Sequence, residues 1–395
     1  MKYNIWRDCP KKPITELLSF IVDNRGKTVP TTKDGYKLIA TNCVTNRTLF
    51  PTYEKIRYLS EETYQTWFRA HPMPGDILFV NKGTPGRVCM VPDPVDFCIA
   101  QDMIALRADN KKIYNKYLFA VLRSPIIQQQ IYNTNVGDVI PHFKKQFLDQ
   151  LLIPIPERSI QEFIGNFYYN ISYKIELNQQ INNNLEQQID LIYQSFFAED
   201  MERVELGKAI ETTSGGTPSR KNLAFYENAD IPWVKSKELS GNFITDTEEK
   251  INQLALNKSS AKLLPSHSVL VAMYGATVGE YGIITTEMAC NQAICGLLEN
   301  CDYPFTYLFE FVKHFQEVLK SRAIGSAQQN ISQLVIKQLM VHSNTDKIKK
   351  YHKIVLPLFQ KMELLCKENA RLTDIRDCLL PKLMSGEISF GGNES

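Results

Sequence analysis

The sequence predicts an α+β fold in which two similar mixed α/β domains are joined by two long antiparallel coiled-coil helices, as a pseudo-twofold internal repeat. Three observations predict this fold. Residues 174–196 recur in related form at residues 361–383. Apolar residues in both copies recur every third or fourth position, which is typical of long helices that pack in pairs. The segment before each helix has short apolar runs separated by glycine loops, which is typical of a mixed domain.

Length and composition are those of an ordinary globular protein. The 395 residues are 44% apolar and 22% charged, which suffices for two domains or more. There is no apolar run of about 18 residues, and the N-terminus lacks the apolar region of a signal peptide. The nine cysteines include no Cys-x-x-Cys pair, so we expect free thiols and a cytoplasmic protein. Because the net charge is only +2, a nucleic-acid partner would have to meet a local positive surface.

The elements are expected in a fixed order along the chain. A first mixed domain spans residues 1–157 and is followed by a central helix at 158–199. A second mixed domain spans 200–343, a C-terminal helix spans 344–386, and a tail occupies 387–395.

The interiors of the two mixed domains match one another. MPGDILFVNKGTPG (73–86) resembles LPSHSVLVAMYGATVG (264–279), since each has a proline, a short β-rich run and a glycine loop. GDVIPHFKKQFLDQLLIPIP (137–156) precedes the central helix, and GSAQQNISQLVIKQLMVHSN (325–344) precedes the C-terminal one. The second domain also contains an amphipathic helical pattern at 305–320. The repeat therefore extends beyond the helices.

The two helices are the clearest part of the repeat. Six residues of the central helix fall on identical residues of the C-terminal one, namely Lys174, Glu176, Leu177, Asn182, Leu185 and Asp190. Apolar residues in both copies keep a period close to 3.5 residues, which favours a coiled-coil seam over a one-sided surface helix. The predicted seam residues are Ile171, Ile175, Asn182, Leu185, Ile189, Ile192, Leu358, Met362, Leu365, Asn369, Leu372 and Leu379.

Some details of the helices depend on single residues. Asn182 and Asn369 share one seam position, where a polar residue can fix register. Pro357 should kink the second helix or divide a short lead-in from the main rod. In LLPKLMSGEIS (379–389), Pro381 lies near the helix end and Gly386 should stop the helix. The alternative is two amphipathic helices packed on separate cores.

No catalytic constellation is apparent in the sequence. There is no phosphate-binding P-loop, no Asn-Pro-Pro-aromatic motif and no serine nucleophile elbow. Glu248-Glu249-Lys250 has a nuclease-like form, but without an upstream partner we interpret it as a solvated charge run. The six histidines lack metal-ligand spacing. We therefore predict a binding protein with no metal and no cofactor of its own.

Several segments, in this order along the chain, resemble one known family, the specificity subunits of type I restriction-modification systems. The resemblance covers nearly the whole chain and is strong over 158–389. It is weaker over 1–157, where CNQAICGL (290–297) has only the loose counterpart IAQDMIAL (99–106) and GTPG replaces the usual glycine-threonine-valine-glycine. The segments are NNNLEQQIDLIYQSFF (182–197), LGKAIETTSGGTPS (206–219), IPWVKSKEL (231–239), LVAMYGATVGEYGI (270–283), QNISQLVIKQL (329–339) and LLPKLMSGEIS.

The resemblance implies a function for each part. Each mixed domain would be a target-recognition domain that reads one half of a bipartite double-stranded DNA sequence, and the helices would set the spacing between half-sites. The helices would also dock two methyltransferase subunits, which modify adenines with S-adenosylmethionine. Restriction subunits that translocate DNA with ATP and Mg²⁺ would complete the complex. The chain itself would not be an enzyme.

Candidate DNA-binding residues are cationic and amide side chains in loops, because cations anchor phosphates and amides and guanidinium groups read base edges. For each residue alone, an ordinary surface position is the competing interpretation, and Trp233 is more simply a core residue than a base-stacking one. The first domain offers Arg25, Lys27, Asn42, Arg47, Asn81, Lys82, Arg87 and His142. The second offers Arg220, Lys221, Lys235, Ser236, Lys237, Tyr274, Gln328, Gln329 and Asn330.

Two other classes of function remain open at this point. One is an interaction scaffold whose coiled coil joins other proteins without reading DNA. The other is an enzyme with an unrecognised site in one domain, which the duplication disfavours because no acid-base set occurs in both copies.

Overall fold

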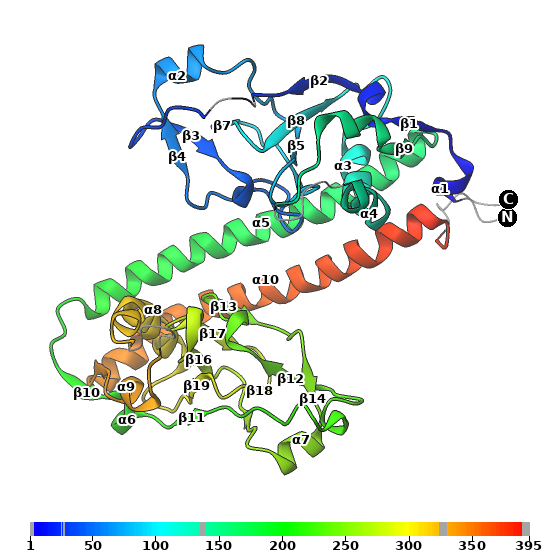
Figure 1. The fold of residues 1–395 in the computed structure, drawn as a ribbon. Helices are drawn as coiled ribbons and strands as arrows, with labels where there is room; N and C mark the ends of the chain where they lie inside the picture. Colours follow the sequence, from blue (N-terminus) through cyan, green and yellow to red (C-terminus); the bar gives the residue numbers. More distant parts are fainter. Residues whose placement is uncertain (1–3, 25, 27, 135–139, 324–329, 389–395) are drawn as a thin grey trace. The chain divides into compact units, whose positions relative to one another are not determined.

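The computed structural model describes all residues except 1–3, 25, 27, 135–139, 324–329 and 389–395. The chain packs as two units (Figure 1). Unit 1 comprises residues 1–177 and 371–395, and unit 2 comprises 178–370. Each unit is one mixed domain with part of both long helices.

Unit 1 contains two small sheets and a two-stranded ribbon. The four-stranded sheet has the order β2-β8-β5-β6 with antiparallel neighbours, and the three-stranded sheet has the order β4-β3-β7 with β3 and β7 parallel. β1 pairs antiparallel with β9. The strands are β1 (Lys11–Pro13), β2 (Leu18–Val22), β3 (Tyr36–Ile39), β4 (Arg57–Leu59), β5 (Ile77–Val80), β6 (Val88–Met90), β7 (Phe97–Ile99), β8 (Met103–Ala108) and β9 (Leu152–Pro154).

Short helices flank these sheets. Ser60 caps one of them, accepting a hydrogen bond from the Thr63 amide in the way expected of a serine N-cap. The helices are α1 (Ile5–Asp8), α2 (Glu61–Thr66), α3 (Asn115–Arg123) and α4 (Pro125–Thr134), with 3-10 turns at Ile14–Leu17, Thr41–Cys43 and Lys145–Gln150.

Unit 2 repeats this plan with one more strand in each of the two sheets. Its five-stranded sheet has the order β11-β19-β16-β17-β13, its four-stranded sheet has the order β14-β12-β18-β15, and β10 pairs with β20. The strands are β10 (Arg203–Glu205), β11 (Thr212–Ser214), β12 (Ile231–Val234), β13 (Asn242–Ile244), β14 (Lys250–Ile251), β15 (Leu263–Leu264), β16 (Val269–Ala272), β17 (Tyr281–Ile284), β18 (Met288–Cys290), β19 (Ile294–Leu297) and β20 (Met340–His342). The helices are α6 (Leu206–Ala209), α7 (Gln253–Lys258), α8 (Phe305–Ser321) and α9 (Gln333–Lys337), with 3-10 turns at Leu223–Phe225, Ser236–Glu238 and Gly275–Thr277.

The central strands are continuous apolar runs because both of their faces are covered. In β5, Ile77 and Phe79 pack into the core beneath α3, while Leu78 and Val80 face the core shared with β7. β16 divides its side chains between two cores in the same alternation. A strand buried on both faces has no polar side to reveal its period, which explains why the sequence shows only a short apolar run.

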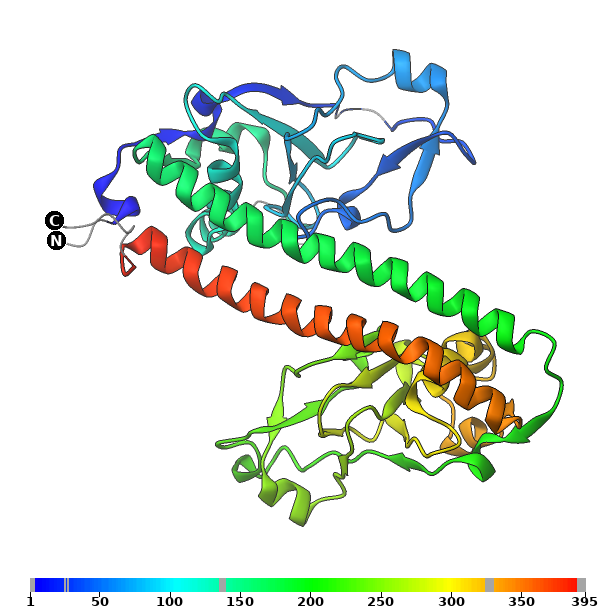
Figure 2. The ribbon, with the colours of Figure 1, turned by 180° about the vertical axis from the view of Figure 1, so that it is seen from behind.

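The long helices are α5 (Arg158–Phe197) and α10 (Thr345–Ser385), and within each unit the segments of the two helices lie side by side (Figure 1 and Figure 2). In unit 2, the Asn178 amide donates to Asn369 Oδ1 at 2.8 Å, and the Asn182 amide donates to Cys366 Sγ at 3.4 Å. Because positions rise along α5 as they fall along α10, the helices are antiparallel, as the sequence predicts.

Each predicted seam residue is buried or half-buried. Four of them are buried, namely Asn182, Ile189, Met362 and Leu365. The others are half-buried, namely Ile171, Ile175, Leu185, Ile192, Leu358, Asn369, Leu372 and Leu379.

The two prolines of α10 do not divide it. The helix runs through Pro357, so the prediction of a separate lead-in is wrong. Pro357 and Lys353, whose carbonyl loses its partner, are both exposed, so water can replace the missing hydrogen bond. The predicted stop at Gly386 is confirmed: its φ is +73°, and the Ile388 amide donates back to the Lys382 carbonyl.

Among the described residues, no helix combines the length and the apolar character needed to span a membrane.

Candidate nucleic-acid interface

In unit 1, main-chain hydrogen bonds join three loops at one end of the four-stranded sheet. β5 ends at Val80, and the next residue, Asn81, donates its amide to the Asp102 carbonyl at 2.7 Å. The Phe143 amide donates to the Asn81 carbonyl, also at 2.7 Å. Lys82 and His142 then form an isolated β-bridge. The loop after β5, the turn before β8 and the segment around His142 are therefore held at one place.

Unit 2 contains the same arrangement. The Met273 amide donates to the Ala293 carbonyl at 2.7 Å, and the Ile331 amide donates to the Met273 carbonyl at 2.9 Å. Tyr274 and Asn330 form the bridge equivalent to that of Lys82 and His142. When the segments that precede the long helices are aligned from Gly137 and Gly325, His142 stands opposite Asn330, and the bridges confirm this sequence-based match.

The glycine loops close their hairpins by the same bond in both units. The Gly86 amide donates to the Val80 carbonyl, and the Gly279 amide donates to the Ala272 carbonyl, each at 3.0 Å. Both glycines have positive φ, +86° and +80°, which favours glycine at these positions. The two loops are therefore closed by the same main-chain hydrogen bond, although GTPG and GATVG differ in length.

A polar cavity of about 590 Å³ lies beside the bridge of unit 1. Arg69 and Lys82 bring positive charge to its wall, and Asp23 and Asp102 bring negative charge. Lys145 forms an ion pair with Asp23 at 3.1 Å. Such mixed donors and acceptors suit the edge of a base better than an apolar ligand. The lining residues are Asp23, Gly26, Arg69, Asn81, Lys82, Gln101, Asp102 and His142.

Asn81, a predicted DNA-binding residue, is fully buried. Its amide nitrogen donates to the Phe143 carbonyl at 3.1 Å, so the side chain ties two of the three loops together. We therefore assign Asn81 to positioning the loops, and its burial disfavours the predicted contact with DNA.

The other predicted residues of unit 1 are spread over its surface. Asn42 is exposed and donates to the Glu54 carbonyl at 2.7 Å. Arg47 is exposed in the turn after Thr45, and Arg87 is half-buried behind the glycine loop. Arg25 and Lys27 lie outside the described residues.

Three of the four predicted cations of unit 2 are paired with carboxylates. Arg220 and Lys235 both contact Glu249, at 2.5 and 2.6 Å, and Lys237 contacts Glu248 at 2.5 Å. Hydrogen bonding to Lys235 holds the pKa of Glu249 below its ordinary value, and the same bond raises the pKa of Lys235. Glu248 is exposed and Glu249 is half-buried, which agrees with the interpretation of a solvated charge run, and both carboxylates also pair with neighbouring cations.

Arg220 also lies over two aromatic rings, 4.8 Å from the centroid of Tyr226 and 5.2 Å from that of Trp233. Trp233 is buried and donates its indole nitrogen to the Gly216 carbonyl at 3.1 Å. The interpretation of Trp233 as a core residue is confirmed. Its ring supports the guanidinium from below.

The remaining predicted DNA-binding residues of unit 2 differ in how exposed they are. Lys221 and Asn330 are exposed, Tyr274 is exposed at the tip of its loop, and Ser236 is half-buried. Gln328 and Gln329 lie outside the described residues.

Sequence reasoning missed four polar residues next to the bridges. Arg69, Gln101 and Asp102 line the cavity of unit 1. Gln292 lies in the equivalent turn of unit 2, where it contacts Thr217. The match of IAQDMIAL with CNQAICGL already aligns Gln101 with Gln292, so that alignment was the available signal.

The comparisons with known proteins agree with this doubled architecture. Residues 15–187 and 198–357 match the family described as the type I restriction modification DNA specificity domain. The chain is 23% identical to the type I restriction enzyme HindI specificity subunit of Haemophilus influenzae, over 80% of this chain and 86% of that protein. It is 24% identical to the MjaIX specificity subunit of Methanocaldococcus jannaschii, over 70% of this chain and 69% of that protein.

A solved structure shows the same fold. The S subunit of a type I restriction-modification system from M. genitalium superposes with a TM-score of 0.62 at 17% identity, covering 97% of this chain and 98% of that chain. Both curated relatives are named as specificity subunits rather than as nucleases or methyltransferases. The chain therefore belongs to the family of type I restriction-modification specificity subunits, as a non-catalytic member with two tandem DNA specificity domains.

Proposed function

We propose that each mixed domain reads one half of a bipartite double-stranded DNA site through the loops joined at its bridge. The observation that carries this proposal is the doubled loop frame. The same main-chain bonds present Lys82 and His142 in unit 1, and Tyr274 and Asn330 in unit 2. One frame with different side chains is what two recognition sites for different half-sequences require.

The side chains around the bridges divide into two roles. Arg220, Lys235 and Lys237 anchor phosphates, exchanging their carboxylate partners for phosphate oxygens. Asn330 and the glutamines Gln101 and Gln292 read base edges, since amides offer a donor and an acceptor together.

The long helices set the spacing between half-sites and dock the partner proteins. The 40 residues of α5 correspond to a rod of about 60 Å. Exposed side chains outside the helix pair, such as Gln179, Gln187, Gln188 and Arg371, are the proposed contacts for two methyltransferase subunits. Those subunits supply adenine methylation with S-adenosylmethionine, and restriction subunits supply ATP- and Mg²⁺-dependent translocation.

Mapping methylated adenines across a genome tests the proposal. The host lacks this gene and then receives it together with its methyltransferase partner. We expect one new split motif, with two short defined halves around a fixed undefined spacer. Absence of any new motif, with both proteins expressed and associated, would favour the scaffold function instead.

Two substitutions make the test specific to the halves. His142→Ala should alter only one half of the motif, and Asn330→Ala only the other. If either variant altered both halves, or if both altered the same half, the assignment of one half to each domain would be wrong.

A further inference from the structure

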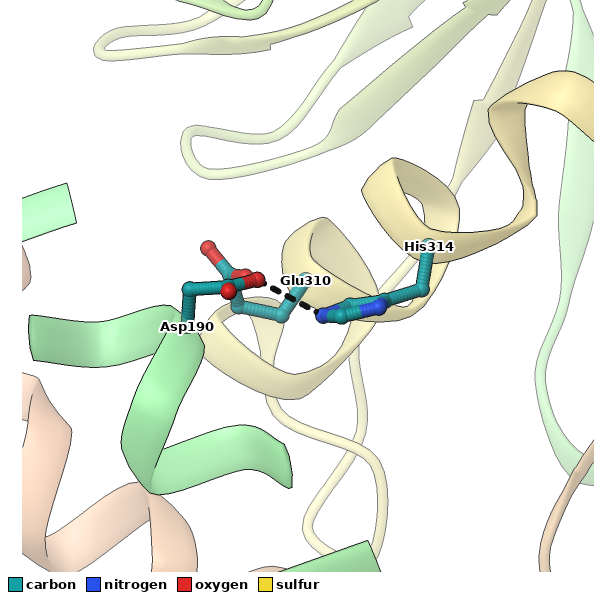
Figure 3. Close-up of side chains that lie close together, drawn as sticks. All are labelled: Asp190, Glu310 and His314. Carbon is teal, nitrogen blue, oxygen red and sulfur yellow. Dashed lines mark ion pairs between the residues drawn. The ribbon is translucent and has the colours of Figure 1, made fainter. Parts of the chain in front are cut away.

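A histidine and two carboxylates meet inside unit 2, away from the bridge. Asp190 belongs to α5, and Glu310 and His314 lie one turn apart on α8 (Figure 3). One potential ligand atom from each residue lies within 4.8 Å of the others. His314 Nε2 and Asp190 Oδ1 are 2.9 Å apart. Imidazole and carboxylate groups together form the donor set that zinc and neighbouring transition metals accept.

Glu310 is the unusual member of this cluster. Its side chain is 1% exposed, and its Oε2 atom has no hydrogen-bond partner. The Lys313 ammonium lies 3.8 Å from that oxygen, which is too far for a hydrogen bond. A buried carboxylate with an unused oxygen is costly unless something else binds it.

The surrounding charge favours a cation. Lys313 contacts Glu186 at 2.9 Å and Asp190 at 4.0 Å as well as Glu310. Three carboxyl groups therefore share one ammonium, which leaves carboxylate oxygens for a dication to bind. Tyr193 stacks on the His314 ring with centroids 4.6 Å apart and fixes its orientation.

The equivalent position of unit 1 lacks two of the three donors. Asp377 of α10 matches Asp190, but the positions of Glu310 and His314 carry other residues. Tyr117 of α3 and Tyr307 of α8 are matched residues, since each is the third residue of its helix and begins a Tyr-Leu-Phe run. In this alignment Ala120 stands for Glu310 and Ser124 for His314. The fold thus does not need a carboxylate or an imidazole here, so their presence in unit 2 calls for a separate reason.

We propose that Asp190, Glu310 and His314 bind one divalent transition-metal ion of the zinc and cobalt type, which fastens α5 to α8 within unit 2. Two donors on one tetrahedral zinc ion lie about 3.3 Å apart, given bond lengths of about 2.0 Å, so Asp190 and His314 need to separate only slightly. The ion replaces the proton between them and takes Glu310 as its third ligand, leaving one position for water. The site is independent of the proposed DNA contacts.

Cobalt titration of the full chain, stripped of metal with EDTA, tests the site. Co²⁺ is the probe because its visible absorption reports its coordination. We expect saturation at one Co²⁺ per chain and displacement by Zn²⁺. Asp190→Asn, Glu310→Gln and His314→Asn should each weaken binding by at least about tenfold. His267→Asn is the matched control, since His267 pairs with Glu363 at 3.0 Å in the same unit but belongs to no three-ligand cluster among the described residues.

A second variant separates a metal site from a plain ion-pair cluster. Lys313→Met removes the competing ammonium, so it should tighten Co²⁺ binding, and Zn²⁺ should raise the thermal midpoint of this variant more than that of the wild type. If Lys313→Met lowered the midpoint and Zn²⁺ did not restore it, the cluster would be an ion-pair network only.

The wild-type chain provides a test that does not depend on any variant folding. In Zn²⁺-soaked crystals, anomalous scattering should place a zinc ion between the three side chains. Co²⁺ binding that is undiminished in His314→Asn, or zinc density found only elsewhere, would overturn the proposal.

Discussion

At the scale of single residues, two carboxylates of unit 2 pair with the cations that we propose as DNA contacts. Glu249 forms ion pairs with both Arg220 and Lys235, and Glu248 forms one with Lys237. These pairs are exposed or partly exposed, so each contributes little to stability. Their main effect is to lower the local positive charge of the protein, which would attract DNA of any sequence.

We expect Glu249→Gln to increase non-specific DNA binding, because it releases two cations for phosphates. The slope of log affinity against log salt concentration should steepen by about one or two counterions. This slope is measured from the binding of random duplex DNA, at several salt concentrations, by the chain in complex with its methyltransferase partner. Glu227→Gln, at an exposed position of the same domain, is the control and should leave the slope unchanged.

The buried Asn81 gives a prediction about stability rather than binding. Asn81→Ala removes the hydrogen bond to the Phe143 carbonyl in a buried site, which should lower the free energy of unfolding by about 1–3 kcal/mol. Urea denaturation measures this. Asn42→Ala, which removes an exposed hydrogen bond of similar kind, should cost clearly less. Equal losses would show that Asn81 does not hold the loops.

His352 gives a prediction about pH. Burial lowers its pKa below the ordinary 6.5, while Glu299 opposes the shift, and its Nδ1 lies 2.9 Å from Thr306 Oγ1. As pH falls below 6.5, the unfolded chain takes up this proton before the folded chain does. The stabilising contribution of His352 is therefore present above pH 6.5 and is lost on acidification.

Comparing the wild type with His352→Asn isolates this residue from the other titrating groups. The free energy of unfolding of the wild type minus that of the variant should fall as the pH is lowered from about 7.5 to about 5.5. A difference that stayed constant over this range would contradict the lowered pKa.

At the scale of elements, the pairing of α5 with α10 restricts how the length of the two helices can change without altering their register. Seven residues complete two turns in a coiled coil, so a heptad inserted into both helices preserves which faces meet. Asn182 and Asn369 occupy equivalent places in the repeat, which makes them matched insertion points.

We expect paired heptad insertions after Asn182 and Asn369 to lengthen the target spacer by about three base pairs. Each insertion adds about 10.5 Å of helix, and DNA rises about 3.4 Å per base pair. Methylation mapping should show unchanged half-sites. If the protein stayed active and the spacer were unchanged, the length of the helices would not set the distance between the half-sites.

Elements also show what sequence could and could not predict. The helices and their antiparallel pairing were predictable, because a seam repeated in two copies is a local and redundant signal. The continuity of α10 through Pro357 was not, because it depends on which face of the helix meets water. The cluster of Asp190, Glu310 and His314 was missed since Asp190 is far in sequence from the other two, and no spacing rule connects α5 with α8.

The candidate interface was predictable in kind but not in detail. The repeat correctly matched His142 with Asn330, because both follow the same glycine signal. The burial of Asn81 and the pairing of Glu249 with Arg220 could not be predicted, since they depend on how loops from distant strands approach each other. Sequence alone shows which loops carry polar groups but not which of those groups turn inward.

At the scale of the whole molecule, the start and the end of the chain contribute to one core. Ile5 and Cys9 pack in the same cluster as Leu380 and Met384 of α10, within unit 1. We therefore expect a circularly permuted chain, with Ser395 linked to Met1 and new ends in the connection between α5 and β10, to keep its methylation motif. A permuted protein that folds but binds neither its partners nor DNA would contradict this.

The bridges have a consequence for how targets change over time. The bonds that hold Lys82 beside His142, and Tyr274 beside Asn330, run between main-chain atoms, so they do not depend on which side chains stand there. Under the proposed function, replacing a side chain at a bridge alters the surface offered to DNA without removing a bond that shapes the loop. We therefore expect a lineage carrying this frame to acquire a new target by point substitution, while its two copies diverge on an unchanged scaffold.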